Sequence, residues 1–146
     1  LELLEGQLFQ SWLEAGRLDE LIRVILARFG RDGGATEIAT LGHHLRQTKD
    51  EARIHALFGS LLSRRVKAFH EWWPRAGEGH LGCMQAAARA SAEAFDVYIE
   101  YFHSLHALGL ADECEALREE MLRFQSRESS RKVLPAARPL RPGAVD

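Results

Sequence analysis

The chain has 146 residues, 46% of them hydrophobic and 27% charged, and its formal net charge is −2. These values are typical of one globular domain and exclude a wholly disordered or collagen-like chain. The slight acidic balance gives no support to a nucleic-acid partner, and the apolar runs are far shorter than the roughly 20 residues that span a membrane.

Helices are expected throughout, because strand-like alternation is almost absent and good helix formers such as Ala, Leu, Glu and Arg dominate. Apolar residues recur three or four positions apart, and glycines or polar breaks separate the repeating segments. We predict a compact antiparallel all-α bundle of five or six amphipathic helices. The expected helices, in chain order, cover residues 2–14, 18–29, 36–46, 49–72, 82–108 and 111–126.

Two of these helices carry recognisable start signals. Thr36 is the expected cap of the third helix. Thr48 and Glu51 have the spacing of a capping box, in which the Thr48 hydroxyl accepts from the Glu51 amide while the Glu51 carboxylate reaches back. Glu51 is therefore interpreted as a cap and not as a functional acid.

The long helix over 82–108 combines a heptad stripe with a first half of small side chains. The stripe consists of Met84, Ala88, Ser91, Phe95, Tyr98, Phe102 and Leu105. Small residues let a neighbouring backbone approach closely, but they can equally line an apolar pocket. An effector-binding bundle is thus one interpretation, with a pocket under Trp72 or Trp73 lined by Ala87, Ala88, Ser91 and Phe95.

The last 20 residues differ from the rest in composition. Three of the four prolines lie there, together with Ser and Arg. We predict a helical domain over residues 1–126 and a Pro/Arg-rich extended tail over 127–146. Acidic residues are concentrated over 76–122 and basic ones after that segment, so the tail is expected to attract the acidic helices of its own or another copy.

Three junctions between expected helices share a pattern: a break, two residues, an acidic pair and a small or apolar residue. The acidic pairs are Asp19-Glu20, Asp50-Glu51 and Asp112-Glu113. This pattern resembles the turns of tetratricopeptide-type helical-hairpin repeats. The resemblance implies a scaffold that presents a concave face to a protein or peptide. The alternative is that the pairs are ordinary acidic helix starts, which the helix dipole favours in any all-α protein.

The chain has seven histidines, and histidine is the commonest metal ligand. Glu100 and His103 form an E-x-x-H on a helix, the spacing by which helical bundles supply metal ligands. No second E-x-x-H is present, and this polar ridge is expected to face water. Glu51 and His55 also have ligand-like spacing. A metal or haem site that uses Glu100, His103 and His55 is the alternative interpretation.

Two features favour a partner-binding surface. Trp72 and Trp73 are adjacent on a helix, so both cannot face one core, and exposed tryptophan is enriched at binding hot spots. Arg64 and Arg65 form a short basic group on the same helix, expected on a solvated face.

We therefore predict a non-catalytic adaptor or regulatory domain that binds another protein or itself, as a possible homodimer, with no cofactor, nucleic acid or membrane. The alternative is a His-rich bundle that binds a metal ion or haem as a redox enzyme or sensor. Two cysteines, Cys83 and Cys114, do not make a disulfide framework and favour the cytoplasm. The chain opens on Leu1 instead of Met, which leaves open an excised piece of a longer protein.

Overall fold

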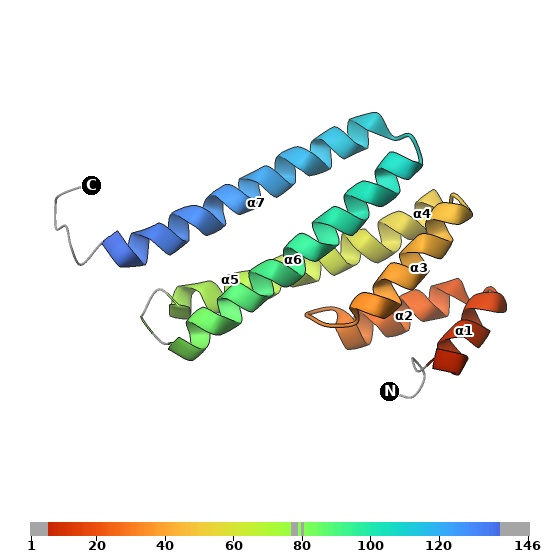
Figure 1. Cartoon of the computed structure of the whole chain (residues 1–146), viewed down its shortest axis with the longest axis horizontal. Coiled ribbons are helices and arrows are strands. Elements are labelled where there is room, and N and C mark those ends of the chain that lie inside the picture. The colour runs from red at the N-terminus through yellow and green to blue at the C-terminus, as the bar shows by residue number, and fades with distance from the viewer. Residues whose placement is uncertain (1–5, 77–78, 80, 138–146) are drawn as a thin grey trace.

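The computed structural model of the chain describes residues 6–76, 79 and 81–137, and these form an all-α bundle (Figure 1). The predicted fold class is confirmed, with six helical rods in the described ranges. Their elements are α1 (Gly6–Glu14), α2 (Leu18–Phe29), α3 (Ala35–Gln47), α4 (Glu51–Ile54), the π-helical turn η2 (His55–Gly59), α5 (Ser60–Ala76), α6 (Leu81–Ala107) and α7 (Ala111–Ala137). None of the described helices has the length and apolar character needed to cross a bilayer.

The elements α4, η2 and α5 follow one another without a break, and we call residues 51–76 the central rod. The rod packs along α6, and α6 packs on α7 in turn, so these three long elements form one side of the bundle (Figure 1). The shorter helices α1, α2 and α3 lie against the other side. The core therefore lies between the rod, α6 and the N-terminal helices.

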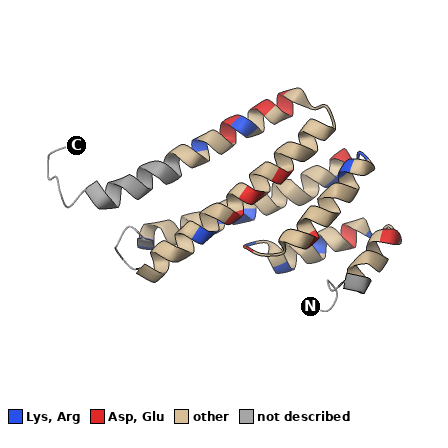
Figure 2. Ribbon diagram, in the orientation of Figure 1, with Lys and Arg blue, Asp and Glu red and all other residues tan. Residues whose placement is uncertain are grey.

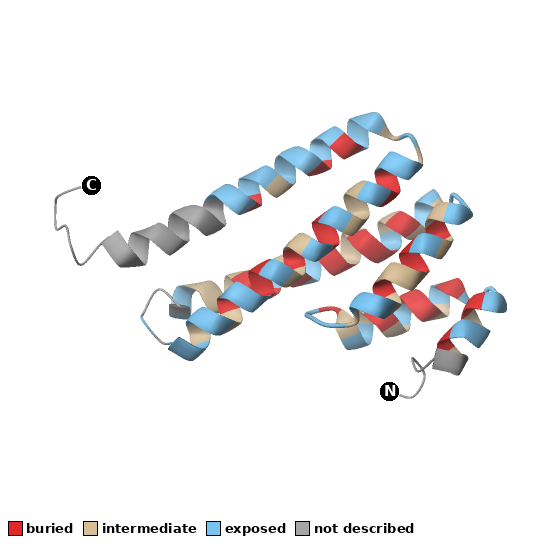
Figure 3. Ribbon diagram, viewed as in Figure 1, coloured by how far each residue is buried: buried red, intermediate tan, exposed pale blue. Residues whose placement is uncertain are grey.

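Buried side chains follow the apolar stripes that the sequence predicts, and Figure 3 shows them concentrated along α2, α3, the rod and α6. Burying each large side chain contributes about 1.5–3 kcal/mol relative to leaving it exposed. The large apolar side chains that are completely inaccessible to solvent are Leu21, Ile25, Leu41, Leu45, Ile54, Leu57, Phe58 and Leu61.

Phe124 fixes α7 to the rest of the bundle. Its ring centroid lies 5.3 Å from those of Phe69 on α5 and Phe95 on α6, both in edge-to-face geometry, and 5.8 Å from that of Tyr98. Such aromatic pairs contribute about 0.5–1.5 kcal/mol beyond their burial. The inward face of this helix consists of Cys114, Leu117, Met121 and Phe124, with Met121 half-buried.

The heptad stripe predicted for α6 is only partly correct. Met84 is 47% exposed and Ala88 is also exposed, whereas Ser91, Tyr98 and Leu105 are buried as expected. At the N-terminal half the buried face is instead made by Ala87, Ala90 and Ala94. The reason is that the rod packs along α6, and the small alanines allow that approach where the longer Met84 would not.

Helix ends differ from the prediction in two places. The rod continues past Trp72 through Pro74 to Ala76, and α7 continues past residue 126 to Ala137. The sequence between 127 and 134 contains no glycine or proline to stop a helix, so the extended tail predicted from residue 127 is wrong over 127–137. The remaining tail, 138–146, and the predicted start of the first helix over 2–5 lie outside the described residues.

Arg65 is buried, with only 2% of its surface exposed, and it ties the loop between α2 and α3 to the rod and α6. Its Nη2 donates to the carbonyl oxygens of Phe29 (2.8 Å) and Gly33 (2.7 Å). Its Nη1 donates to the backbone oxygen (3.2 Å) and Oε1 (3.1 Å) of Glu93. Burial lowers the pKa of the guanidinium, and the charge of Glu93 opposes that effect.

The expectation that Arg65 faces solvent and binds a partner is therefore wrong. The physical reason is its position on the rod: Leu61, Leu62 and Phe69 lie three or four residues away and are all buried, so Arg65 shares their inward face. The adjacent Arg64 is exposed, and its Nη1 donates to the backbone oxygen of Leu26 (2.8 Å).

The neighbouring arginines give a matched test of this assignment. Arg65→Ala is expected to lower the free energy of unfolding by about 3 kcal/mol, because it leaves the carbonyls of Phe29 and Gly33 and the Glu93 side chain without their buried donor. Arg64→Ala removes one exposed hydrogen bond and is expected to cost about 1 kcal/mol or less. Urea unfolding followed by circular dichroism measures both values. Equal losses for the two variants would contradict the structural role of Arg65.

Candidate functional site

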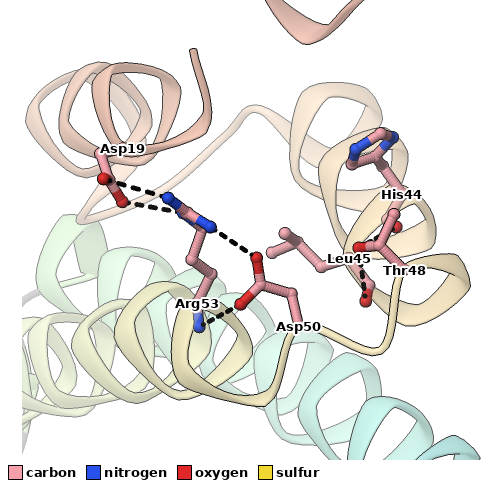
Figure 4. A network of polar contacts seen from close by, with 6 residues as sticks. All are labelled: Asp19, His44, Leu45, Thr48, Asp50 and Arg53. Atoms are coloured by element: carbon pink, nitrogen blue, oxygen red, sulfur yellow. Dashed lines mark hydrogen bonds and ion pairs between the residues drawn. The ribbon is translucent and has the colours of Figure 1, made fainter. Parts of the chain in front are cut away.

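The starts of α2, α4 and α7, which carry the three acidic pairs, lie toward one end of the bundle (Figure 2). Arg53 links two of them (Figure 4): its Nε donates to Oδ1 of Asp19 (2.9 Å) and its Nη1 to Oδ2 of Asp50 (2.7 Å). The hydrogen bond from Arg53 lowers the pKa of the exposed Asp19 carboxyl. This network fixes the start of the rod against α2.

Asp50, and not Thr48, caps the rod. Oδ1 of Asp50 accepts from the Arg53 amide at 3.2 Å (Figure 4). The Thr48 hydroxyl instead donates to the backbone oxygens of His44 (3.1 Å) and Leu45 (3.3 Å) at the end of α3. The predicted capping box is therefore wrong. Lys49 takes a left-handed backbone with φ of 53°, and the N-cap lies two residues beyond the predicted one.

The predicted cap of α3 is also wrong. The helix begins at Ala35, and its N-cap is Gly34, which has a left-handed backbone (φ 70°) and offers no side chain. Thr36 lies inside the first turn. A β-carbon at Gly34 would come within 2.3 Å of the Phe29 ring, so the turn requires glycine at this position.

Because Glu51 is not a cap, its carboxylate is available beside His55. Nε2 of His55 lies 3.6 Å from Oε2 of Glu51 and 2.9 Å from Oε1 of Glu113, at the start of α7. Ligand atoms of these three side chains all lie within 4.8 Å of one another. We call Glu51, His55 and Glu113 the His55 cluster. It joins the rod to α7 through two acids and one imidazole.

Tyr101 of α6 fixes the other side of the imidazole. Its hydroxyl lies 2.6 Å from Nδ1 of His55, and the two rings meet edge to face. Burial raises the pKa of Tyr101, and the charges of Glu113 and Glu120 raise it further, so the phenol stays neutral near pH 7. The π-helical turn begins at His55, and π turns occur frequently at functional sites.

A surface groove of about 550 Å³ opens next to this cluster, between the rod, the end of α6 and the first half of α7. We call it the α5–α7 groove. Its apolar lining comes from Leu62, Val66, Leu105 and Leu117. Its polar lining includes His55, Tyr101, Glu113 and Glu120. The groove thus combines an apolar floor with an acidic margin.

The metal ligands predicted from the sequence do not come together. Glu100 pairs with Arg46, whose Nη1 lies 3.3 Å from Oε1 of Glu100 and also donates to Ser104. His103 is exposed. Only His55 of the three predicted ligands belongs to the cluster. No sequence pattern pointed to Glu113, because its proximity to His55 depends on the path of α7. Glu51 was interpreted as a helix cap and therefore not as a ligand.

The predicted partner-binding residues have different environments. Trp73 stacks on Phe69, with ring centroids 6.2 Å apart. Trp72 lines a hollow of about 160 Å³ together with Arg31 and Ala86, and the Arg75 guanidinium lies over its ring. Both tryptophans are half-buried. Trp73 is partly covered by a side chain of its own helix, and Trp72 by residues of the α2–α3 loop and α6, so the two adjacent positions have different neighbours.

The predicted pocket residues have separate environments as well. Ala87 and Ser91 are buried, Ala88 is exposed, and Phe95 packs its ring on Phe124. None of them lines the α5–α7 groove, which lies toward the other end of α6. The hollow beside Trp72 uses Ala86 and Ala90 of the small-residue segment instead.

Comparison of the chain with protein-family models, with curated proteins and with solved structures gives no significant match. The resemblance of the three junctions to tetratricopeptide-type turns therefore stays a prediction. The α5–α7 groove and the His55 cluster are the two features from which we infer function.

The capping assignment is tested by comparing Asp50→Ala with Thr48→Ala. Loss of the Asp50 cap is expected to lower the free energy of unfolding by about 1 kcal/mol, because the Arg53 amide loses its acceptor. Thr48→Ala is expected to stay within about 0.5 kcal/mol of the parent protein. Asp50→Asn keeps a capping oxygen and should recover most of the loss seen with alanine. Urea unfolding measures the free energy of unfolding of each variant. A larger loss of stability for Thr48→Ala than for Asp50→Ala would contradict capping by Asp50 and support the predicted capping box.

Proposed function

We propose that the chain is a non-catalytic helical interaction domain that binds a segment of another protein in the α5–α7 groove. The observation that carries this proposal is the groove itself, an open hollow of about 550 Å³ with an apolar floor between two long helices. Ligand sites commonly measure roughly 300–1,000 Å³. A groove between helices also suits an amphipathic segment that inserts several apolar side chains.

The lining indicates the chemistry of the bound segment. Leu62, Val66 and Leu117 offer apolar surface to side chains such as Leu, Ile or Phe. Glu113 and Glu120 lie at the margin and are exposed, so they favour a Lys or Arg next to those apolar residues. We therefore propose a basic amphipathic segment as the ligand.

We propose that the bound segment belongs to a different protein. The alternative is that a second copy of this chain supplies it. The sequence after Phe124 is rich in arginine, which gives another copy a segment of suitable charge. A cytoplasmic setting is part of the proposal and is supported by the two free cysteines, Cys83 and Cys114. Sedimentation of the full chain separates the two sources, because self-binding makes the mass depend on concentration.

Two exposed alanines provide a matched test of the groove. Ala116 lines it, whereas Ala92 of α6 does not, and both lie on helix surfaces. Short peptides selected from a random displayed library on the immobilised protein are expected to be basic and amphipathic. Ala116→Arg should abolish their binding in fluorescence anisotropy, because a long cation fills the groove and repels the ligand. Ala92→Arg should bind like the parent protein.

Glu120→Lys gives an independent measurement of the charge contribution. It should weaken binding of the selected basic peptides and reduce the salt dependence of their affinity. Failure to select any peptide, or equal binding by the Ala116→Arg and Ala92→Arg variants, would contradict the proposed groove.

A further inference from the structure

We propose that the His55 cluster binds one divalent transition-metal ion, of which Zn²⁺ is the test case, through Nε2 of His55 and the carboxylates of Glu51 and Glu113. This site goes beyond the proposed interaction function and does not rest on it. Its evidence is the geometry of three ligand atoms brought together by the rod and α7.

The spacing of the ligand atoms fits such an ion. Zinc bonds to imidazole nitrogen and carboxylate oxygen measure about 2.0–2.2 Å, which places two ligands of a tetrahedral ion roughly 3.4 Å apart. Nε2 of His55 lies 2.9 Å from Oε1 of Glu113 and 3.6 Å from Oε2 of Glu51, values on either side of that spacing. Because all three atoms lie within 4.8 Å of one another, small rotations of exposed side chains suffice to surround an ion.

The imidazole is oriented as a metal ligand requires. A ligating histidine usually hydrogen-bonds through its other ring nitrogen, which fixes the tautomer and the direction of the ring. Here the Tyr101 hydroxyl lies 2.6 Å from Nδ1. A neutral phenol oxygen can accept from Nδ1–H, and this leaves the lone pair of Nε2 directed toward the two carboxylates. Tyr101 is therefore a positioning residue for the site.

Charge and access also favour a cation. Two carboxylates against one imidazole leave an excess of negative charge, which a divalent ion balances. The side chains are 36% (His55), 52% (Glu51) and 44% (Glu113) exposed, so an ion can enter and water can complete its coordination. His55 and Glu113 also line the α5–α7 groove.

The donor set selects among metals. Ca²⁺ and Mg²⁺ prefer sites made only of oxygen, whereas an imidazole favours Zn²⁺ and its neighbours in the first transition series. We therefore expect Zn²⁺ to bind and an equal concentration of Ca²⁺ to leave it bound.

The test is calorimetric titration of zinc chloride into the metal-free full chain, in a Cys83→Ser background that removes the accessible thiol. One equivalent of zinc is expected to bind and to raise the thermal unfolding midpoint, because the ion links the rod to α7. His55→Ala and Glu113→Gln should abolish both effects. Tyr101→Phe should weaken zinc binding by about tenfold or more while keeping the stoichiometry.

His103→Ala and Glu100→Gln are the matched controls, because they remove the same residue types from the sequence-predicted pair outside the cluster. Both should bind zinc like the parent protein. Circular dichroism verifies that each variant keeps its helices. If His55→Ala unfolds, Glu113→Gln still tests the site, because it is a conservative substitution at an exposed position. No binding of zinc, unchanged binding by Glu113→Gln, or loss of binding in His103→Ala would overturn the proposal.

Discussion

Three arginines of the central rod hold α2 at both of its ends, and the arrangement of the bundle depends on this clamp. Arg53 binds Asp19 in the first turn of α2, while Arg64 and Arg65 donate to backbone oxygens of its last turn, at Leu26 and Phe29. The cations at the C-terminal end oppose the negative end of the helix dipole, so charge and hydrogen bonding favour the same placement. With α2 fixed parallel to the rod, the apolar faces of both helices meet, and α3 packs against α4 and α6.

Much of the fold could be predicted from local pattern, because helix periodicity and breakers are properties of neighbouring residues. The limits of α2 match the prediction at both ends. Arg65 was misplaced for a different reason. A charged side chain was assigned to water by its type, although its helix position placed it with buried leucines. Most of its partners are backbone oxygens, those of Phe29, Gly33 and Glu93, which no side-chain pattern records.

The candidate site was less predictable, because its parts meet only through tertiary structure. The spacing of Glu51 and His55 was visible in the sequence, but a plausible capping motif explained Glu51 locally. The left-handed backbone at Lys49 changes which residue caps the rod and frees that acid. Glu113 and Tyr101 approach His55 from more than 40 residues away. The repeated acidic pairs were a signal for this end of the bundle, since at least one member of each pair belongs to the Arg53 network or the His55 cluster.

The π-helical turn over 55–59 has a further consequence for the register of the rod. A wide turn accommodates one residue more than a regular α-helical turn, and each α-helical residue corresponds to a rotation of about 100°. If the segment kept its length but closed to regular α-helical pitch, everything after the turn would rotate by about that angle relative to α4. Asp50 and Arg53 would keep their partners while Arg65 would turn away from its loop. The wide pitch of this segment therefore sets the phase between the two ends of the rod.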